Sequence, residues 1–452
     1  MMMRGSGGRA CPEPIPSGRR GKSDCTLVSV CRRRINRDNP LMDASVLNRS
    51  HESESNRRHI CIVTETYPPE INGVALTLAH LVNGLLRLGH SVSLIRPRQL
   101  ESGTFEGSDK YKAILVRGLP LPGYKGLQFG LPAGRLLRNV WMRHRPDVVY
   151  IATEGPLGWS AVCAARRLRI QAFSGFHTNY HIYSKHYRLG RLQDLVFKYL
   201  RAFHNRTTGT LVASADLCGR LQGLGFKNVN VLGRGVDNQL FAPDRRCAQL
   251  RKSWGLTDDD LAILYVGRLA PEKNVLLAVD AYRAMQGRTT RPKFILVGDG
   301  PISGVLQRLH PDLIFAGQQT GEQLARYYAS GDVFLFPSET ETFGNVTLEA
   351  MASGLLVIAY DYAAAKVHIR HGETGLLVPY GESQAFIQTV ANLGDNRSIS
   401  HIRKRAREYA RGVDWPRVVE KFERLLAGAG AQQQSIFQDA TKLRPMAETG
   451  RL

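Results

Sequence analysis

Two glutamates follow the apolar run VFLFP, in a segment with the pattern of a strand, a loop and a helix. Glu341 lies in the loop, and Glu349 lies about one turn inside a helix that we expect to begin near Gly344 and Asn345. The first N–H groups of a helix lack partners within it and its end is partially positive, so Gly344, Asn345 and Val346 are suited to hold a diphosphate. Glu349 can accept two hydrogen bonds from a ribose diol, and Glu341 can approach a hexose. The segment therefore predicts a site for a sugar attached to a nucleoside diphosphate.

The two glutamates also have a simpler interpretation, because acids in the first turn of a helix favour its dipole. The surrounding sequence favours the site, since FPS precedes the pair and AMASG follows it. Thr342 and Phe343 complete the loop, and we include them among the residues expected to bind the nucleotide sugar.

Two cations follow another apolar run, AILYVG. Arg268 and Lys273 lie on one strand-end loop, where together they can neutralise both phosphates of a nucleoside diphosphate and stabilise it as a leaving group. Either cation alone is more often a solvated loop charge. Gly298 and Asp299 form a turn typical of a strand end, and we assign them to the nucleotide side of the same site.

The first half of the chain offers two weaker signals. Asn72, Gly73 and Val74 open a predicted helix, where glycine lets the backbone approach a ligand closely, although a plain tight turn explains them equally well. His177 ends the strand in FSGFHTN. A single histidine beside an apolar run is more often a hydrogen-bonded core residue than a catalytic one.

All of these residues follow short apolar runs that alternate with amphipathic stretches, the signature of βαβ units and mostly parallel sheets. Ligands of open α/β sheets bind beyond the carboxyl ends of the strands, so we expect the segments to converge on one cleft. The pattern restarts near Ala262, which predicts an α/β fold with two Rossmann-like domains. The expected strands are 59–64, 91–97, 113–118, 148–152, 171–175, 210–214 and 229–232, followed by 262–267, 293–298, 313–317, 333–337, 356–360 and 375–378.

The chain divides into five expected parts. They are a disordered basic tail (1–56), an N-terminal Rossmann-like domain (57–235), a C-terminal Rossmann-like domain (236–412), a helix packing back towards the first domain (413–428) and a polar tail (429–452). The junction lies within 233–243, where glycines and a proline interrupt the pattern. Because folded patterning begins only at His59, we also expect translation to start at Met42.

Composition limits the class of protein. The 452 residues are 43% hydrophobic and carry a net charge of +22, which indicates an anionic partner: nucleic acid, an acidic membrane surface or a phosphorylated substrate. Seven cysteines without a CxxC pair argue against a disulfide framework or a structural zinc site. No apolar run approaches the roughly 20 residues that span a bilayer, so we expect a cytoplasmic protein. We expect no bound metal, because the acidic residues 258–260 lie in a solvated turn.

The segment SETETFGNVTLEAMASG resembles the motif of the retaining GT-B glycosyltransferases of family 4, in which seven residues separate two glutamates. The likeness extends from about Ile60 to Val378 through YPPEINGV, FHTN, RGVD, VGRLAPEKN and VGDGP. The nearest subgroup is that of the GDP-mannose-dependent α-mannosyltransferases and sulfoquinovosyl-diacylglycerol synthases. This resemblance implies the GT-B fold, in which two parallel sheets face an interdomain cleft, with the acceptor in the first domain and the nucleotide-sugar donor in the second.

The resemblance also implies roles for the residues above. Glu341 would contact the donor sugar and stabilise positive charge at its anomeric carbon, and Glu349 would bind the ribose. Arg268 and Lys273 would clamp the diphosphate, and His177 would lie beside the transferred sugar. The departing phosphate would help to deprotonate the acceptor, so a separate general base is not required.

The loop 72–74 would reach the same diphosphate, and members of this class generally need no metal. One segment departs from the family pattern: residues 361–366 read DYAAAK where many members have a glycine-glycine-proline turn near the donor sugar. This departure leaves open which hexose is transferred. We expect transfer of mannose from GDP-mannose to a lipid-linked or glycan acceptor. The alternative is a UDP-sugar-dependent synthase that transfers glucose, glucuronate or sulfoquinovose to diacylglycerol.

Two basic stretches, 135–145 and 188–206, suggest contact with an anionic membrane surface on its cytoplasmic face. Basic amphipathic helices can lie on such membranes, although core-packed helices with a solvated basic side show the same pattern. Two other classes compete with the transferase. A nucleotide-sugar epimerase shares the architecture, and a nucleic-acid-binding protein fits the charge but lacks a recognisable motif.

Overall fold

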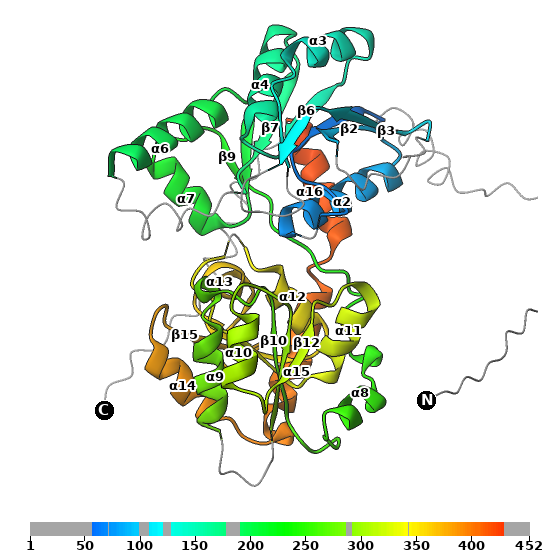
Figure 1. Ribbon diagram of the computed structural model, residues 1–452. Coiled ribbons are helices and arrows are strands. Elements are labelled where there is room, and N and C mark those ends of the chain that lie inside the picture. Colours follow the sequence, from blue (N-terminus) through cyan, green and yellow to red (C-terminus); the bar gives the residue numbers. More distant parts are fainter. Residues whose placement is uncertain are drawn as a thin grey trace, which may run out of the picture. The chain divides into compact units, whose positions relative to one another are not determined.

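The computed structural model describes residues 57–70, 72–98, 108–120, 128–177, 190–285, 292–341 and 343–428, with the backbone alone at 190–193. The expected tails, 1–56 and 429–452, and Thr342 of the expected site lie outside the described residues. Helices and strands are numbered as in Figure 1.

Within the described residues, seven parallel strands form the first sheet, in the order β3-β2-β1-β6-β7-β8-β9. Figure 1 labels β2, β3, β6, β7 and β9 of this sheet. The central strands are buried on both faces, which explains why their sequences read as continuous apolar runs. The strand order reverses between β1 and β6, the position at which ligands bind to such sheets. The strands are β1 (His59–Val63), β2 (Ser91–Pro97), β3 (Tyr111–Val116), β6 (Val148–Ile151), β7 (Gln171–Gly175), β8 (Gly209–Val212) and β9 (Val229–Val231).

Helices cover both faces of this sheet. Ile60 and Ile62 of β1 share a hydrophobic cluster with helix α2 (Gly73–Arg87), while Cys61 and Val63 share another with helices α3 (Gly134–Arg143) and α4 (Pro156–Arg167). Successive residues of a strand point to opposite faces, so these clusters lie on the two sides of the sheet. Two further helices, α6 (Gly190–His204) and α7 (Ala215–Gly223), pack around Phe176.

The last described helix, α16 (Trp415–Leu426), completes the core of the first sheet. Its buried residues Val419, Phe422 and Leu426 join the cluster of β1, β2 and α2. The two helices are in close contact, because a Cβ at Gly84 of α2 would lie 2.3 Å from a methyl group of Val419. Asp414 caps α16 by accepting a hydrogen bond from the backbone N–H of Arg417.

In the part of the chain that the structure describes, six parallel strands form the second sheet, in the order β12-β11-β10-β13-β14-β15. Its order reverses between β10 and β13, again at the position suited to a nucleotide. The strands are β10 (Ala262–Val266), β11 (Lys293–Val297), β12 (Ile314–Gly317), β13 (Val333–Phe336), β14 (Leu356–Tyr360) and β15 (Leu376–Val378). Its helices are α8 (Ala248–Ser253), α9 (Val275–Arg283), α10 (Ser303–Leu309), α11 (Gly321–Ser330), α12 (Asn345–Ala352), α13 (Ala363–His368), α14 (Ser383–Ala391) and α15 (Asn396–Arg411), with short 3-10 turns η1 (Pro243–Arg245) and η2 (Pro271–Lys273).

The prediction of a strand at 113–118 is wrong in its bounds, because the observed strand begins and ends earlier in the chain. The observed strand β3 ends at Val116, and Gly118 begins a separate antiparallel ribbon made of β4 (Gly118–Pro120) and β5 (Gln128–Gly130). A Cβ at Gly118 would lie 2.9 Å from that of Pro97, so the chain needs a glycine where it leaves the sheet edge.

A buried carboxylate holds three arginines beside the second sheet. Asp332, which precedes β13, has no solvent exposure and accepts hydrogen bonds from Arg251 and from the backbone N–H of Ala262, both at 2.8 Å. Arg246 and Arg403 lie 3.1 and 3.2 Å from its other oxygen. The cluster links α8 and α15 to the strand whose other end carries the expected catalytic loop.

Candidate active site

Lys273 and Glu341 meet where the strand order of the second sheet reverses. Lys273 ends the turn η2 after β10, and Glu341 lies in the loop after the neighbouring strand β13. The Lys273 Nζ lies 2.5 Å from Glu341 Oε1 and also donates a 2.7 Å hydrogen bond to the carbonyl of Thr340. Two residues that are 68 positions apart in the sequence therefore share one side of the site.

Two hydroxyl groups fix Glu341 in addition to the lysine. Ser338 Oγ donates a hydrogen bond of 2.8 Å to Glu341 Oε1, and Tyr362 Oη donates one of 3.0 Å to the Glu341 carbonyl. The carboxylate is thus held by contacts to one of its oxygens, while the loop backbone is tied to the segment after β14.

A small hollow opens beside this carboxylate. Glu341, Ser338 and Tyr362 line it together with Thr347 and Ala363. Ala363 has a φ of +52°, a conformation that favours glycine, so the segment keeps a glycine-like turn although it carries a Cβ. The DYAAAK segment therefore shapes the wall next to Glu341.

Arg268 lies on the same loop as Lys273 but points elsewhere in this structure. Its side chain is 55% exposed and lies 3.7 Å from the carboxylate of Glu272. The structure thus brings Lys273 to Glu341 and leaves Arg268 at the surface of the loop.

Glycines bring the loops after β10 and β11 together. Gly298 has a φ of +138°, and a Cβ there would lie 1.9 Å from the carbonyl oxygen of Gly267. Only glycine fits this close contact between two backbones. Asp299 is exposed, and its carboxylate accepts a 2.7 Å hydrogen bond from the next backbone N–H, that of Gly300. In this structure Gly298 shapes the loop that carries Arg268.

The start of helix α12 is open to an anion. Gly344 precedes it with a φ of +93°, and no side chain among the described residues caps the helix. Its first N–H groups, at Asn345 and Val346, therefore remain available to a charged ligand. Phe343 is buried and its carbonyl accepts a hydrogen bond from the N–H of Ala364, which ties the loop to α13.

Glu349 lies further along the same helix and is partly buried. Tyr328 of α11 donates a 3.0 Å hydrogen bond to its Oε2 atom. Burial raises the pKa of Glu349 to about 7, and the tyrosine hydrogen bond only partly offsets this. The carboxylate therefore changes its charge near neutral pH.

At the edge of the first sheet, Asn72 caps helix α2. Its Oδ1 atom accepts hydrogen bonds from the N–H groups of Val74 and Ala75, at 3.1 and 2.9 Å. The next residue, Gly73, is exposed, and a Cβ there would meet no atom of the described part of the chain within 4 Å. Packing does not require this glycine, so the space above the first turn is open to a ligand.

Both ring nitrogens of His177 have protein partners. Arg234 donates a hydrogen bond of 2.9 Å to Nδ1, and Tyr150 Oη lies 3.2 Å from Nε2. A guanidinium can only donate, so Nδ1 is unprotonated and the ring proton is on Nε2. Burial, with a smaller effect of the Arg234 charge, holds the pKa of His177 well below its usual range. The imidazole is neutral.

Comparisons with known proteins show the family of this chain. The sequence model described as "Glycosyltransferase Family 4" matches residues 71–240, and "Glycosyl transferases group 1" matches residues 260–396. A GDP-mannose-dependent alpha-mannosyltransferase of Mycobacterium tuberculosis is 33% identical over 369 residues, covering 80% of this chain and 94% of the relative. The chain belongs to glycosyltransferase family 4. It is a hexosyltransferase of the retaining GT-B class.

Two more distant proteins extend the likeness to nearly the whole transferase. The sulfoquinovosyl transferase SQD2 of Arabidopsis thaliana is 28% identical over 414 residues, covering 89% of this chain and 78% of the relative. The structure of sucrose-phosphate synthase from Thermosynechococcus elongatus matches with a TM-score of 0.68 at 21% identity, covering 82% of this chain and 99% of that one. This structural match supports the expected GT-B fold.

Sequence reasoning missed several side chains that hold the transferase site. Ser338 is part of the FPS run that framed the glutamates, and Tyr362 is part of the unusual DYAAAK segment, so both lay within segments already singled out. Tyr328 and Tyr150 carried no signal, because a tyrosine in a helix or strand is usually a core residue. Arg234 lies in RGVD, which supported the family resemblance without suggesting a role.

The acidic turn 258–260 is structural in the transferase. Asp260 Oδ2 accepts a hydrogen bond of 2.8 Å from the N–H of Thr257, and Asp258 Oδ1 lies 3.9 Å from Arg251. Among the described ranges, no three His, Cys, Asp or Glu side chains are grouped as a metal site would require.

Proposed function

We propose that this transferase moves mannose from GDP-mannose to a lipid-linked or glycan acceptor. The contact that carries the proposal is the one between Lys273 and Glu341. This contact supports the proposal because a cation that would hold a diphosphate and a carboxylate that would face the sugar lie next to each other where the strand order of the second sheet reverses. GDP-mannose is favoured because the mycobacterial relative, at 33% identity, bears that donor in its name.

The diphosphate would bind at the open start of α12, with Arg268 and Lys273 neutralising its charge. Gly73 would offer its backbone to the same group, because no atom of the described residues lies within 4 Å of the position that a Cβ would take there. These positive groups stabilise the diphosphate as it leaves, so we propose that the reaction needs no metal. Full activity in the presence of a chelator checks this, and loss that only a divalent cation restores contradicts it.

Glu349 would accept hydrogen bonds from the ribose, and Glu341 would stabilise positive charge at the anomeric carbon. His177 would lie beside the transferred sugar as a neutral side chain. Its two ring nitrogens are already bonded to Arg234 and Tyr150, which disfavours a role as general base. We therefore propose that the departing phosphate takes the proton of the acceptor hydroxyl.

A panel of nucleotide sugars tests the donor. The purified protein is heated with GDP-mannose, GDP-glucose, UDP-glucose and UDP-glucuronate, and we expect the largest rise in the unfolding midpoint with GDP-mannose. Transfer to glycolipid acceptors is then followed by mass spectrometry. A midpoint that responds only to UDP-sugars would contradict the choice of donor. Conversion of the donor without any acceptor, seen by NMR, would contradict the transfer reaction.

A UDP-sugar-dependent glycolipid synthase is the second candidate. It is favoured by the Arabidopsis relative, which covers 89% of this chain, and by the DYAAAK segment beside the hollow at Glu341. The same panel separates the two candidates, because this one requires the largest midpoint shift with a UDP-sugar.

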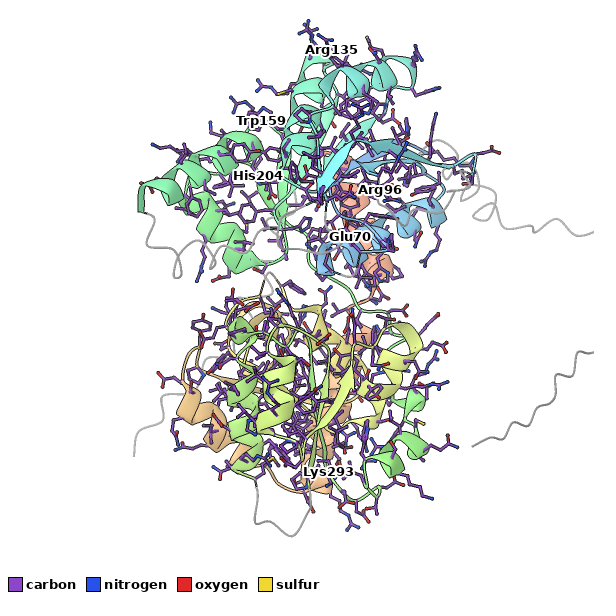
Figure 2. All side chains as sticks on the ribbon, in the orientation of Figure 1. Glu70, Arg96, Arg135, Trp159, His204 and Lys293 are labelled. Atoms are coloured by element: carbon purple, nitrogen blue, oxygen red, sulfur yellow. The ribbon has the colours of Figure 1, made fainter. Side chains whose placement is uncertain are left out.

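The acceptor would be presented at an anionic membrane surface, with the transferase on its cytoplasmic side. Among the described residues no helix is long and apolar enough to cross a bilayer. Helix α3 has no acidic residue, and its exposed side chains include Leu136 and Met142 as well as Arg135 and Arg143. Figure 2 labels Arg135 on this helix. Basic and apolar side chains on one exposed helix favour anionic lipid surfaces.

Vesicle sedimentation tests this surface. We expect binding to vesicles that contain an anionic phospholipid, and weaker binding when Leu136 and Met142 are both changed to Ser. The matched control is Leu276→Ser. Leu276 is 50% exposed and lies on α9, a helix that packs on the second sheet. Equal binding of all variants, or none by the wild type at moderate salt, contradicts the proposal.

A further inference from the structure

Arg234 is a buried cation at the carboxyl edge of the first sheet. It follows β9 between two glycines, and its side chain is only 6% exposed. The guanidinium donates to His177 Nδ1 at 2.9 Å and makes long hydrogen bonds to the carbonyls of Leu232 and Gly233, at 3.4 and 3.5 Å. All three acceptors are neutral, so none of them balances the charge.

The part of the chain that the structure describes gives Arg234 no carboxylate. The acids nearest in sequence to the strand ends are engaged elsewhere: Glu154 lies 3.4 Å from His204, and Glu65 accepts a hydrogen bond from the N–H of Leu157. Residues 155–193, which include the segment directly after His177, contain no Asp or Glu. A local carboxylate therefore cannot come from that segment either.

The chain treats another buried arginine differently. Arg251 is 2% exposed and lies 2.8 Å from the buried carboxylate of Asp332. Buried charges in proteins are normally paired in this way, because an unpaired one loses its hydration without compensation. Arg234 departs from that rule at the edge of the sheet where substrates of α/β enzymes bind.

Resting on the proposed transfer reaction, we infer that Arg234 binds an oxyanion of one of the two substrates: the diphosphate of the donor or an acidic group on the acceptor. Its planar fork leaves donors for such a group while one nitrogen holds His177. Arg234 thus has two roles, since it also keeps the neighbouring imidazole in its neutral form with the proton on Nε2.

Two binding measurements separate the sources of the oxyanion, and neither needs turnover. The first is the affinity for GDP, measured by calorimetry. The second is the shift of the unfolding midpoint caused by glucuronate, with glucose as the neutral probe, when GDP is already saturating. The variants are Arg234→Gln and Arg234→Lys, and Arg87→Gln at the exposed end of α2 is the matched control.

We expect Arg234→Gln to weaken one of the two interactions about tenfold or more, because a charge-assisted hydrogen bond is lost. Arg234→Lys keeps the positive charge but lacks the planar fork of the guanidinium. We expect its binding to be weaker than that of the wild type and stronger than that of Arg234→Gln. Weaker GDP binding assigns the oxyanion to the donor, and a lost glucuronate shift assigns it to the acceptor. The unfolding midpoint of ligand-free Arg234→Gln should not fall, since an uncompensated charge has been removed.

A purely structural arginine gives the opposite pattern. In that case the ligand-free midpoint of Arg234→Gln falls, while GDP and glucuronate bind as they do to Arg87→Gln, and the inference is overturned. Because both arms measure binding, they decide the role of Arg234 even if the wild-type protein transfers no mannose. Absence of transfer would instead count against the proposed function.

Discussion

Lys273 and Glu341 form an ion pair of 2.5 Å across the point where the strand order of the second sheet reverses. Both side chains are largely buried, and Lys273 has no other charged partner among the described residues. Each charge therefore balances the other while the donor is absent. In the proposed site, a diphosphate that takes over Lys273 would release Glu341 towards the sugar, which would couple donor binding to the state of the proposed catalytic carboxylate.

Replacing Glu341 by Gln should separate catalysis from binding. We expect kcat to fall by about 100-fold or more, because the variant cannot stabilise positive charge at the anomeric carbon. GDP should bind at least as tightly as to the wild type, since Lys273 no longer has a competing carboxylate. Initial rates and calorimetry measure the two effects. The control is Glu339→Gln, whose side chain contacts Asn274 instead of Lys273. A kcat near that of the control would remove Glu341 from the catalytic machinery.

Replacing Lys273 by Ala should mainly weaken binding of the donor nucleotide. A hydrogen bond to a charged group contributes about 1.5–3 kcal/mol, so GDP affinity is expected to fall about 10- to 100-fold. The loss should shrink as salt rises, because screening weakens the interaction in the wild type. Lys252→Ala, on the exposed side of α8, is the control and should bind GDP normally. Unchanged GDP affinity in the Lys273 variant would exclude Lys273 from the diphosphate site.

The strands and the glutamate loop could be predicted from sequence for one physical reason. Parallel strands are buried on both faces, so they appear as short apolar runs, and β2, β7 and β14 lie where those runs lie. The loops after such strands meet at one edge, which made the approach of Lys273 to Glu341 an expected consequence of topology.

The partners of these residues could not be predicted in the same way. The bond from Tyr362 to the Glu341 carbonyl depends on the path of a loop whose sequence departs from the family. The bond from Tyr328 to Glu349 depends on how α11 packs on α12. The unbalanced charge of Arg234 is visible only after the nearby carboxylates have been located. Contacts between side chains far apart in sequence require coordinates.

The hydroxyl group of Tyr362 should affect the activity of the proposed catalytic loop that carries Glu341. Tyr362→Phe removes one hydrogen bond of about 1 kcal/mol, so kcat is expected to fall about fivefold with little effect on GDP binding. Tyr362→Ala also enlarges the hollow beside Glu341 and should change the ratio of kcat/KM for GDP-mannose and GDP-glucose. Tyr380→Phe is the matched control, because its hydroxyl group donates an equivalent 3.0 Å bond to the carbonyl of Glu339. Equal ratios in all variants would show that this wall does not select the hexose.

Asp332 should be a major contributor to the stability of the second sheet. Asp332→Asn leaves three arginines without their shared carboxylate, which is expected to lower the free energy of unfolding by about 3–5 kcal/mol. Urea denaturation measures this as a lower midpoint. Asp312→Asn is the control, since Asp312 pairs with the single arginine Arg283 at an exposed position and should contribute less than about 1 kcal/mol. Similar losses of unfolding free energy in both variants would mean that the burial of Asp332 does not determine its contribution to stability.

Glu349 should make donor binding depend on pH. Its pKa is raised from 4.5 to about 7 by burial, so the folded donor-free protein binds a proton that the unfolded chain does not between these values. The contribution of Glu349 to the free energy of unfolding therefore increases as pH falls from 7 towards 4.5. In the proposed contact the ribose hydroxyls need the ionised carboxylate, so the dissociation constant for GDP should rise as pH falls below about 7, by at most about tenfold per unit.

Glu349→Gln tests that assignment because it removes the titrating group and keeps the shape. The variant should bind GDP more weakly than the wild type at pH 8, with a dissociation constant that changes little between pH 8 and pH 5.5. Glu65 complicates stability measurements, since burial raises its pKa to about 7 as well, but it belongs to the first sheet and should affect the wild type and the variant alike. The difference between the two proteins therefore reports on Glu349 alone. A wild-type affinity that does not vary over this range, or a variant that keeps the full variation, would contradict the ribose contact.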